Sequence, residues 1–131
     1  MQFQIQDYLT YCFQKSFDGY SVESYKDDKK QYHRSNGPAL IHYYPDGTIA
    51  EQFWFEHGKS HNLNGPAYIV YEKDGKVHAR SWYINGEFVT QKYARKSKIE
   101  SKKSEKTKLL EKISEIENNL KELRNNVQQT S

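Results

Sequence analysis

The sequence is poor in the residues and segments on which several classes of protein depend. Its 131 residues include one cysteine, Cys12, three prolines and one methionine. A lone cysteine cannot close an intramolecular disulfide, so the chain is not a disulfide-stapled scaffold and a reducing compartment is expected. No run approaches the roughly 18 consecutive apolar residues of a membrane-spanning helix, so we do not expect a membrane partner. The opening residues MQFQIQDYLTYCF lack the basic, apolar and cleavage segments of a signal peptide, which predicts a cytoplasmic protein.

What the sequence does contain is divided unevenly along the chain. Hydrophobic residues make up 35% of the total, too few for a thick core, while tyrosine alone contributes 11 residues. Such a composition suits the half-buried surfaces of a sheet. Residues 1–90 carry 9 basic and 11 acidic side chains and residues 91–131 carry 11 and 6, which gives formal charges of −2 and +5. An anionic partner would therefore be met by the second part.

A repeat of 28 residues organises the first part of the chain. Residues 36–63, NGPALIHYYPDGTIAEQFWFEHGKSHNL, align without a gap on residues 64–91, NGPAYIVYEKDGKVHARSWYINGEFVTQ. Unrelated segments rarely share an Asn-Gly-Pro-Ala run, an Asp-Gly pair and a tryptophan at one spacing, so two equivalent structural units are predicted. The ten identical pairs are Asn36/Asn64, Gly37/Gly65, Pro38/Pro66, Ala39/Ala67, Ile41/Ile69, Tyr43/Tyr71, Asp46/Asp74, Gly47/Gly75, Trp54/Trp82 and Gly58/Gly86.

A third, degenerate unit is expected upstream, at about residues 8–35. It lacks the Asn-Gly-Pro-Ala start, and a step of 28 residues places Lys26 at the position of Trp54. A terminal unit of a repeat array has only one neighbour to pack against, so a worn capping unit would have these properties. The upstream matches are Asp18-Gly19 with Asp46-Gly47, Tyr25 with Phe53, and His33 with His61.

The repeated residues predict antiparallel strand pairs. Ala39, Ile41 and Tyr43 lie two residues apart, so they share one face of a strand, the candidate core face. The Asp-Gly pairs at 46–47 and 74–75 predict tight turns, because glycine adopts the positive φ that such turns require. His57-Gly58 and Asn85-Gly86 close the next strands. We therefore predict a mainly β domain over residues 1–90, an antiparallel β-meander of repeated hairpins.

The aromatic residues of this domain are candidate partner-binding residues. In the strand after residue 48, we expect Ile49, Glu51, Phe53 and Phe55 on one face, and Ala50, Gln52 and Trp54 on the other. A thin sheet cannot bury aromatics on both faces, and Trp and Tyr dominate the hot spots of interfaces. The residues predicted to be exposed, or covered by a partner, are Tyr44, Phe53, Trp54, Trp82 and Tyr83.

The repeat resembles MORN-type repeats. The likeness is carried by the Tyr-Tyr-Pro-Asp-Gly of residues 43–47, the aromatic run 53–55 and the closing Gly58. The segment His-Arg-Ser-Asn-Gly-Pro-Ala of residues 33–39 is similar to the His-Arg-x-x-Gly-Pro-Ala start of the variant found in phage and bacterial proteins. The second unit departs from it, with Asn62 in place of the arginine. The resemblance, over about residues 17–90, implies strand-pair units and a binding or scaffolding role, and it brings no catalytic residues. If the chain is phage-encoded, its compartment would be the host cytoplasm.

The second part of the chain, residues 91–131, is predicted to be a basic helix that continues into a coiled-coil segment at 106–127. It has no Gly or Pro and is rich in Lys, Glu, Leu and Ile. Its apolar residues alternate at spacings of four and three, which fits the a and d positions of a heptad repeat. A stripe this narrow favours self-association, in a dimer or a trimer, over docking onto the protein's own sheet. A partner's helix, or a frayed and disordered segment, is the third alternative. The predicted oligomerisation residues are Leu109, Ile113, Ile116, Leu120, Leu123 and Val127.

Before Leu109 the a and d positions are mostly basic, because Lys106 and Lys102 occupy them together with Ile99. This segment could neutralise phosphates of a nucleic acid without reading their sequence, bind an anionic membrane surface, or serve only as a solvated linker. The candidate anion-binding residues are Lys92, Arg95, Lys96, Lys98, Lys102, Lys103 and Lys106.

No arrangement of residues in the sequence predicts catalysis, a metal or another cofactor. His57 and His61 are four residues apart, but Gly58 breaks the segment, so they do not share a helix face as metal ligands would. Cys12 has no neighbouring base or orienting group that would make it a nucleophile. Asp27 and Asp28 lie in the charged run KDDKK, which predicts an exposed loop.

The sequence therefore favours a non-catalytic module that binds or scaffolds macromolecules. In this interpretation the aromatic sheet binds a partner protein and the helix forms a homo-oligomer. One alternative is a nucleic-acid or ribonucleoprotein binder that works through the basic helix at 92–108. A second, suggested by the likeness to phage repeats, is an inhibitor of a host enzyme or defence protein.

Overall fold

The computed structural model describes residues 9–130 of the chain. Residues 1–8 and Ser131 lie outside the described residues. Residues 1–8 include the start of the predicted first unit and most of the opening segment that lacks signal-peptide features. The chain divides into two compact units, residues 1–95 and residues 96–131.

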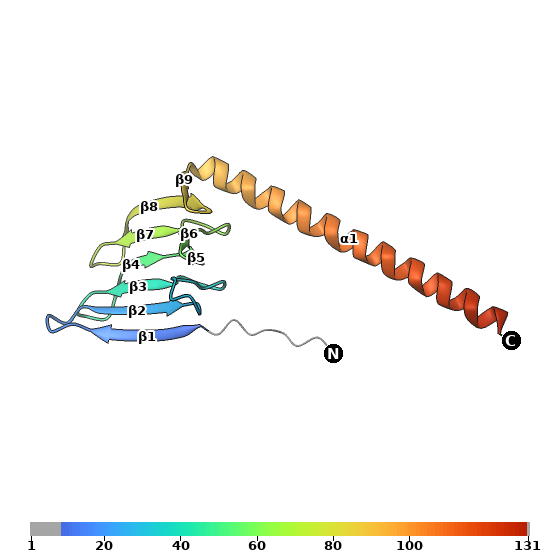
Figure 1. The fold of residues 1–131 in the computed structure, drawn as a ribbon. Helices are drawn as coiled ribbons and strands as arrows, with labels where there is room; N and C mark the ends of the chain where they lie inside the picture. The colour runs from blue at the N-terminus through green and yellow to red at the C-terminus, as the bar shows by residue number, and fades with distance from the viewer. Residues whose placement is uncertain (1–8, 131) are drawn as a thin grey trace. The chain divides into compact units, whose positions relative to one another are not determined.

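The described strands of the first unit form an antiparallel meander, as predicted. The main sheet has seven strands in the order β1-β2-β3-β4-β7-β8-β9, and β5 and β6 form a separate two-stranded hairpin (Figure 1). The strands are β1 (Thr10–Lys15), β2 (Ser21–Lys26), β3 (Leu40–Tyr43), β4 (Ile49–Phe53), β5 (Phe55–Glu56), β6 (Lys59–Ser60), β7 (Tyr68–Tyr71), β8 (Val77–Ile84) and β9 (Glu87–Val89).

Three Asp-Gly turns, 28 residues apart, line up at one end of the strands (Figure 1). They connect β1 to β2, β3 to β4 and β7 to β8, and their glycines have φ angles of +92°, +87° and +90°. In each turn the aspartate Oδ1 accepts a hydrogen bond from the backbone N–H two residues later. The upstream turn thus has the same conformation as the other two.

The second turn of each complete unit is fixed by a histidine of the preceding segment. The backbone N–H of His57 donates to His33 Nδ1 at 3.0 Å, and one repeat later the N–H of Asn85 donates to His61 Nδ1 at 3.0 Å. His57 and Asn85 have positive φ angles of 45° and 51°, so both turns have the left-handed backbone typical of two-residue hairpins. His33 and His61, which the repeat aligns with each other, therefore have the same structural role.

Two details of the predicted alignment were wrong because the complete units contain a β-bulge at the start of the second strand. The bulge pairs Ile49 with Tyr43 and Glu51 with His42, so Ile49 does not share a face with Glu51 as predicted. The upstream unit has no such bulge. Tyr25 therefore takes the place of Trp54, and not Lys26: the backbone N–H of Tyr25 donates to Ala39 O, as that of Trp54 donates to Ala67 O.

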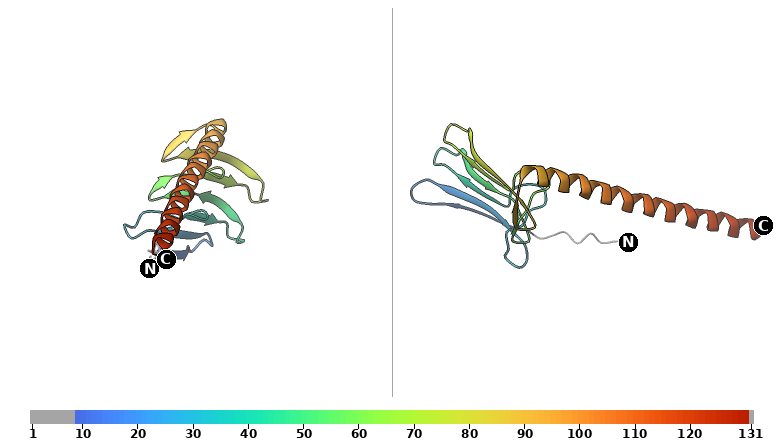
Figure 2. Two further views of the ribbon diagram at one scale, coloured as in Figure 1. Left: turned by 90° about the vertical axis from the view of Figure 1, so that its right-hand side faces the viewer. Right: turned by 90° about the horizontal axis from the view of Figure 1, so that it is seen from above.

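The sheet is a single curved layer (Figure 2). Few of its side chains are buried, so its core is thin. Its buried apolar residues are small or medium-sized, and Ala39 and Ala67, at 0% and 1% exposed, are the most enclosed. Ile41 and Ala50 complete the group, and no large side chain is fully buried among residues 9–130. Small residues at these positions let the chain pack closely, but most aromatic side chains remain half-exposed.

The second unit consists of most of helix α1 (Gln91–Gln129), which begins where the composition of the sequence changes. The Thr90 hydroxyl accepts a hydrogen bond from the Tyr93 N–H at 3.2 Å, which is the contact of an N-cap residue. Of the 39 residues in α1 only Ala94 is buried. Among residues 9–130, the structure contains no helix with both the length and the apolar character of a bilayer span.

Candidate functional site

The strand register separates the side chains of the sheet into two faces with different properties. Residues directly opposite each other on paired strands point to the same side. One row across the sheet runs Glu23, Ile41, Gln52 and Ile69, and its neighbours Tyr43 and Tyr71 lie on the same side. We call this the preserved face, because the repeat keeps its Ile and Tyr residues. The other side, the variable face, carries the rows Val22, His42, Glu51, Val70 and Ser24, Leu40, Phe53, Tyr68.

Contacts on the preserved face recur from one unit to the next. The Tyr43 hydroxyl donates to Glu23 Oε1 at 2.9 Å, and the Tyr71 hydroxyl donates to Gln52 Oε1 at 2.7 Å. Partial burial, together with the bond to the Glu23 carboxylate, raises the pKa of Tyr43 to about 12. Since both complete units use the same type of contact, this face serves to hold the repeat together.

The variable face carries a polar triad that occurs once among residues 9–130. Glu51 lies between two partners: its Oε2 is 2.8 Å from His42 Nδ1, and its Oε1 accepts a hydrogen bond from the Tyr68 hydroxyl at 2.7 Å. Partial burial, with the bond to Glu51, raises the pKa of Tyr68 to about 12. The side chains of His42 and Glu51 are 38% and 30% exposed, so the triad is open to solvent and to a partner.

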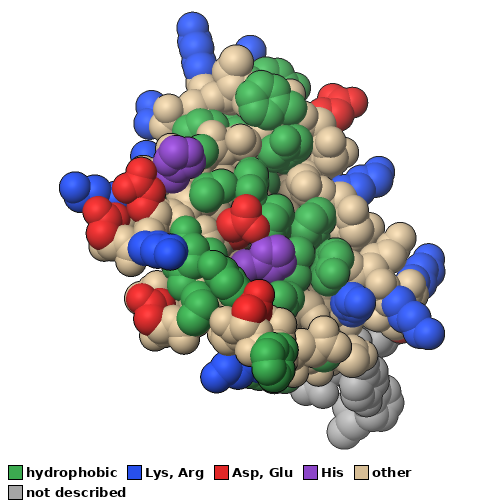
Figure 3. Space-filling model, turned by 90° about the vertical axis from the view of Figure 1, so that its left-hand side faces the viewer, with side chains coloured by type: hydrophobic (Ala, Val, Ile, Leu, Met, Phe, Trp, Pro, Cys, Tyr) green, Lys and Arg blue, Asp and Glu red, His purple; other side chains and the backbone are tan. Residues whose placement is uncertain are grey.

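Apolar side chains surround this triad. Phe53 stacks on Tyr68 with ring centroids 4.5 Å apart, and its ring also meets the edge of His42 at 5.5 Å. Leu40 is paired with Phe53 across β3 and β4, and Val22 and Val70 flank the His42 and Glu51 pair. Figure 3 shows a face of the molecule with this composition, on which hydrophobic side chains gather around a histidine and acidic side chains.

The repeat itself does not require these residues. The aligned positions of His42, Glu51 and Phe53 in the next unit are Val70, Ala79 and Ser81. The strand pairing is the same in both units, so the fold accepts either set. Of the eight residues in the two rows of the variable face, Phe53 alone was predicted to bind a partner. The variable face could have been found from the residues that differ between the aligned repeats. The predictions relied instead on the residues that are identical.

The five aromatics predicted to bind a partner are all half-buried. Phe53 belongs to the variable face. The Tyr44 hydroxyl donates to Tyr71 O at 2.6 Å, and the ring of Tyr83 packs edge-on against Phe88. The backbone of Trp54 links its strand to Ala67, and Trp82 pairs with Val89. Among residues 9–95, the exposed aromatics are instead Tyr11, Phe13, Phe17, Tyr20, Phe88 and Tyr93.

The predicted oligomerisation residues form an exposed apolar stripe on α1, which we call the apolar seam. They are between 48% and 68% exposed: Leu109, Ile113, Ile116, Leu120, Leu123 and Val127. The adjacent Leu110 is also exposed, at 56%. The predicted anion-binding residues precede the seam on the same helix, and all except the half-buried Lys98 are exposed.

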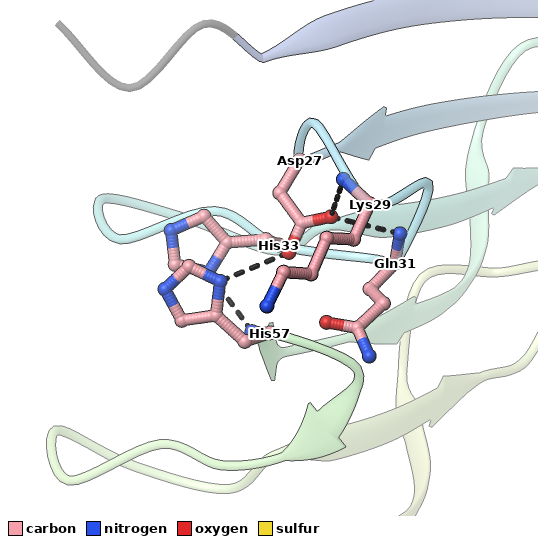
Figure 4. A network of polar contacts seen from close by, with 5 residues as sticks. All are labelled: Asp27, Lys29, Gln31, His33 and His57. Carbon is pink, nitrogen blue, oxygen red and sulfur yellow. Dashed lines mark hydrogen bonds and ion pairs between the residues drawn. The ribbon is translucent and has the colours of Figure 1, made fainter.

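Asp27 was wrongly predicted to lie in an exposed loop, because it is 6% exposed and organises the turn after β2. Its Oδ1 accepts hydrogen bonds from the backbone N–H groups of Lys29 and Gln31, and its Oδ2 is 2.9 Å from His57 Nδ1 (Figure 4). The His57 ring stacks on the buried His33 with centroids 3.8 Å apart. The bond from His57, followed by those from Gln31 and Lys29, holds the pKa of Asp27 below its usual range.

The other candidate residues occupy positions with separate roles. His61 Nε2 is 3.4 Å from Glu56 Oε2, while its Nδ1 accepts the Asn85 N–H, so both of its ring nitrogens are engaged. Within residues 9–130, no cluster of three or more His, Cys, Asp or Glu side chains is placed to hold a metal ion. Cys12 is an exposed free thiol on the edge strand β1.

Comparisons with known proteins add no relative to this picture. The chain matches no family model, no curated protein and no solved structure.

Proposed function

We propose that the protein is a non-catalytic binding module whose copies assemble through the apolar seam of α1 and bind a partner protein through the variable face of the sheet. The observation that carries the proposal is the exposed seam on a helix that buries a single residue, Ala94. In proteins, most of the stability of a helix comes from the packing of its apolar face rather than from intrinsic propensity. Six apolar residues at heptad spacing would supply the missing stabilisation by packing against other copies.

The variable face supports the second half of the proposal. It combines half-exposed Leu40, Phe53 and Tyr68 with the polar His42 and Glu51 pair, and aromatic residues such as Phe53 and Tyr68 are enriched in protein interfaces. Its residues differ from those of the aligned unit while the fold stays the same, so their identities serve a purpose other than folding. The resemblance to MORN-type repeats implies a binding or scaffolding role as well. Several copies on one stalk would also raise the apparent affinity for a multivalent partner.

Light scattering after size exclusion tests the assembly. We expect the wild-type protein to have the mass of a dimer or trimer and Leu120→Glu, which places a charge in the seam, to have the mass of a monomer. Asn118→Glu adds the same charge two residues away, outside the a and d positions, and should keep the wild-type mass. A wild-type monomer, or a Leu120→Glu protein that stays assembled, would contradict the proposal.

A matched pair of substitutions tests the variable face. Val70 lies on this face, opposite Glu51, whereas Val77 is paired with Tyr71 of the preserved face. We expect Val70→Lys to lose the partner that wild-type protein captures from a lysate of its native cell, and Val77→Lys to retain it. Circular dichroism of both variants checks that the sheet is intact. Equal capture by the two variants would move the binding site away from the variable face.

A further inference from the structure

The basic residues between positions 92 and 106 of α1 lie on the same side of the helix as the apolar seam. If the heptad of the seam is continued towards the N-terminus, the a, d, e and g positions from 92 to 106 hold seven basic residues among nine, the others being Ile99 and Glu105. The b, c and f positions from 93 to 104 hold none: they are Tyr93, Ala94, Ser97, Glu100, Ser101 and Ser104. We call the seven the basic seam: Lys92, Arg95, Lys96, Lys98, Lys102, Lys103 and Lys106.

This distribution of basic residues is the opposite of the one expected if the lysines served only to keep the helix soluble. In a coiled coil the b, c and f positions face the solvent, and a linker helix made soluble by lysines would carry them there. The exposure of the side chains also differs between the two sides of the helix. Ala94 is buried and Ser97 and Ser101 are half-buried, whereas the basic seam is exposed except for half-buried Lys98. Every ion pair of residues 9–130 joins two residues between Asp27 and His78, so no ion pair within the described residues neutralises the basic seam.

Assembly through the apolar seam would bring these charges together, and this step rests on the proposed function. A parallel dimer places Lys112 at g opposite Glu117 at e of the second copy, whereas an antiparallel pair centred on the seam places the two Glu117 side chains near each other. In the parallel dimer, Lys102 and Lys106 would face their counterparts across the interface. Like charges at such positions repel, so the two helices would separate before residue 106 and form a fork with basic inner sides.

We propose that this fork binds a nucleic-acid duplex. The basic seam from residue 92 to 106 extends over about 21 Å, at about 1.5 Å per helical residue. Paired helices that diverge into basic segments suit the grooves of a duplex. Six of the seven residues are lysines, which contact phosphates as point charges, so the fork binds with little sequence preference.

The residues around the basic seam favour a duplex over other polyanions. A single strand is bound by aromatic side chains on which its bases stack, and Tyr93, the one aromatic in this part of the helix, lies on the outer side. A helix that binds a membrane surface carries an apolar face beside its basic one. Here Ile99 is the only aliphatic residue larger than alanine between residues 91 and 108.

The double variant Lys102→Leu/Lys106→Leu tests the fork, because it extends the apolar seam while it removes four charges from each dimer. We expect its dimer to dissociate at lower protein concentration than wild type, while its affinity for a mixed-sequence duplex falls at least about tenfold at moderate salt. The slope of log affinity against log salt should fall by up to about 3.6, at about 0.9 per phosphate contact. Lys108→Leu removes a charge from the outer side and should leave affinity and slope close to those of wild type.

Fluorescence anisotropy of the labelled duplex and light scattering of each full-length variant are measured in the same buffers. A dimeric wild type that fails to bind the duplex, or equal losses in Lys102→Leu/Lys106→Leu and Lys108→Leu, would overturn the fork and leave the proposed assembly standing. A monomeric wild type would overturn both. Binding to vesicles of anionic lipid without binding to the duplex would assign the basic seam to a membrane surface instead.

Discussion

The sheet unit and helix α1 differ in where their order comes from. The inner strands β2, β3, β4, β7 and β8 are each hydrogen-bonded on both sides, and each Asp-Gly turn is fixed by its own aspartate. Helix α1 has a single buried residue in 39, and its apolar residues are exposed. The sheet unit therefore contains its own stabilising contacts, whereas in the proposed assembly the helix would acquire them by association. The proposal thus predicts one part of the chain whose stability is independent of protein concentration and one part whose stability depends on it.

Dilution should separate the two parts and is the largest effect we expect. Trp54 and Trp82 are the only tryptophans and both lie in the sheet unit, so their fluorescence reports on the sheet alone. Far-ultraviolet circular dichroism is dominated by α1. Below the dissociation constant of the oligomer we expect most of the helical ellipticity to disappear while tryptophan emission stays constant. If the two signals changed together, the sheet would depend on assembly as much as the helix does.

Two isoleucine substitutions sharpen the comparison. Ile41 is 6% exposed in the sheet, whereas Ile113 is 50% exposed in the apolar seam. Ile41→Ala removes buried methyl groups and should lower the free energy of unfolding of the sheet by about 2–5 kcal/mol. Ile113→Ala should leave the sheet unchanged and weaken only the oligomer. Urea unfolding followed by tryptophan fluorescence measures the first effect, and the concentration dependence of mass measures the second.

A smaller effect separates a histidine that the repeat uses from one that it does not. His33→Ala leaves the His57 N–H without its acceptor, and an unsatisfied backbone donor costs about 1–3 kcal/mol. The His42 and Glu51 pair is partly exposed, so His42→Ala should cost no more than about 1 kcal/mol. Urea midpoints at equal protein concentration provide the measurement. A larger loss in His42→Ala would mean that the variable face stabilises the fold.

The features that could be predicted from the sequence are those that depend on neighbouring residues. The Asp-Gly turns, the hairpin turn at Asn85-Gly86 and the start of α1 near residue 91 are local, and the structure confirms them. The β-bulge is not local. It arises from the pairing of β3 with β4, so an alignment by fixed steps of 28 residues placed Lys26, and not Tyr25, at the tryptophan position. The Ile and Tyr residues that are identical in both units lie on the preserved face, so they identified that face. They could not identify the variable face, because its residues differ between the units.

Asp27 shows why a charged run is a weak guide to burial. KDDKK has the composition of a solvated loop, but the side chain of Asp27 is enclosed by contacts with His57, which lies 30 residues away in the sequence. That contact forms only when the second turn of the following unit folds back beside β2, and no pattern within the run reveals it. The predicted oligomerisation and anion-binding residues, in contrast, lie on one helix, where spacing alone determines which of them share a side.

Asp27 also supplies the smallest expected effect, a dependence of the sheet's stability on acid pH. The pKa of Asp27 is lowered in the folded protein, mainly by the bond from His57. The stabilisation is therefore complete above the unfolded-state pKa of about 3.9 and is lost as the pH falls through the lower folded-state value. We expect Asp27→Asn to be less stable than wild type near neutral pH and to show a flatter decline below about pH 4. Urea midpoints from tryptophan fluorescence across this range test it, and parallel declines in the two proteins would show that the His57 contact does not hold the turn.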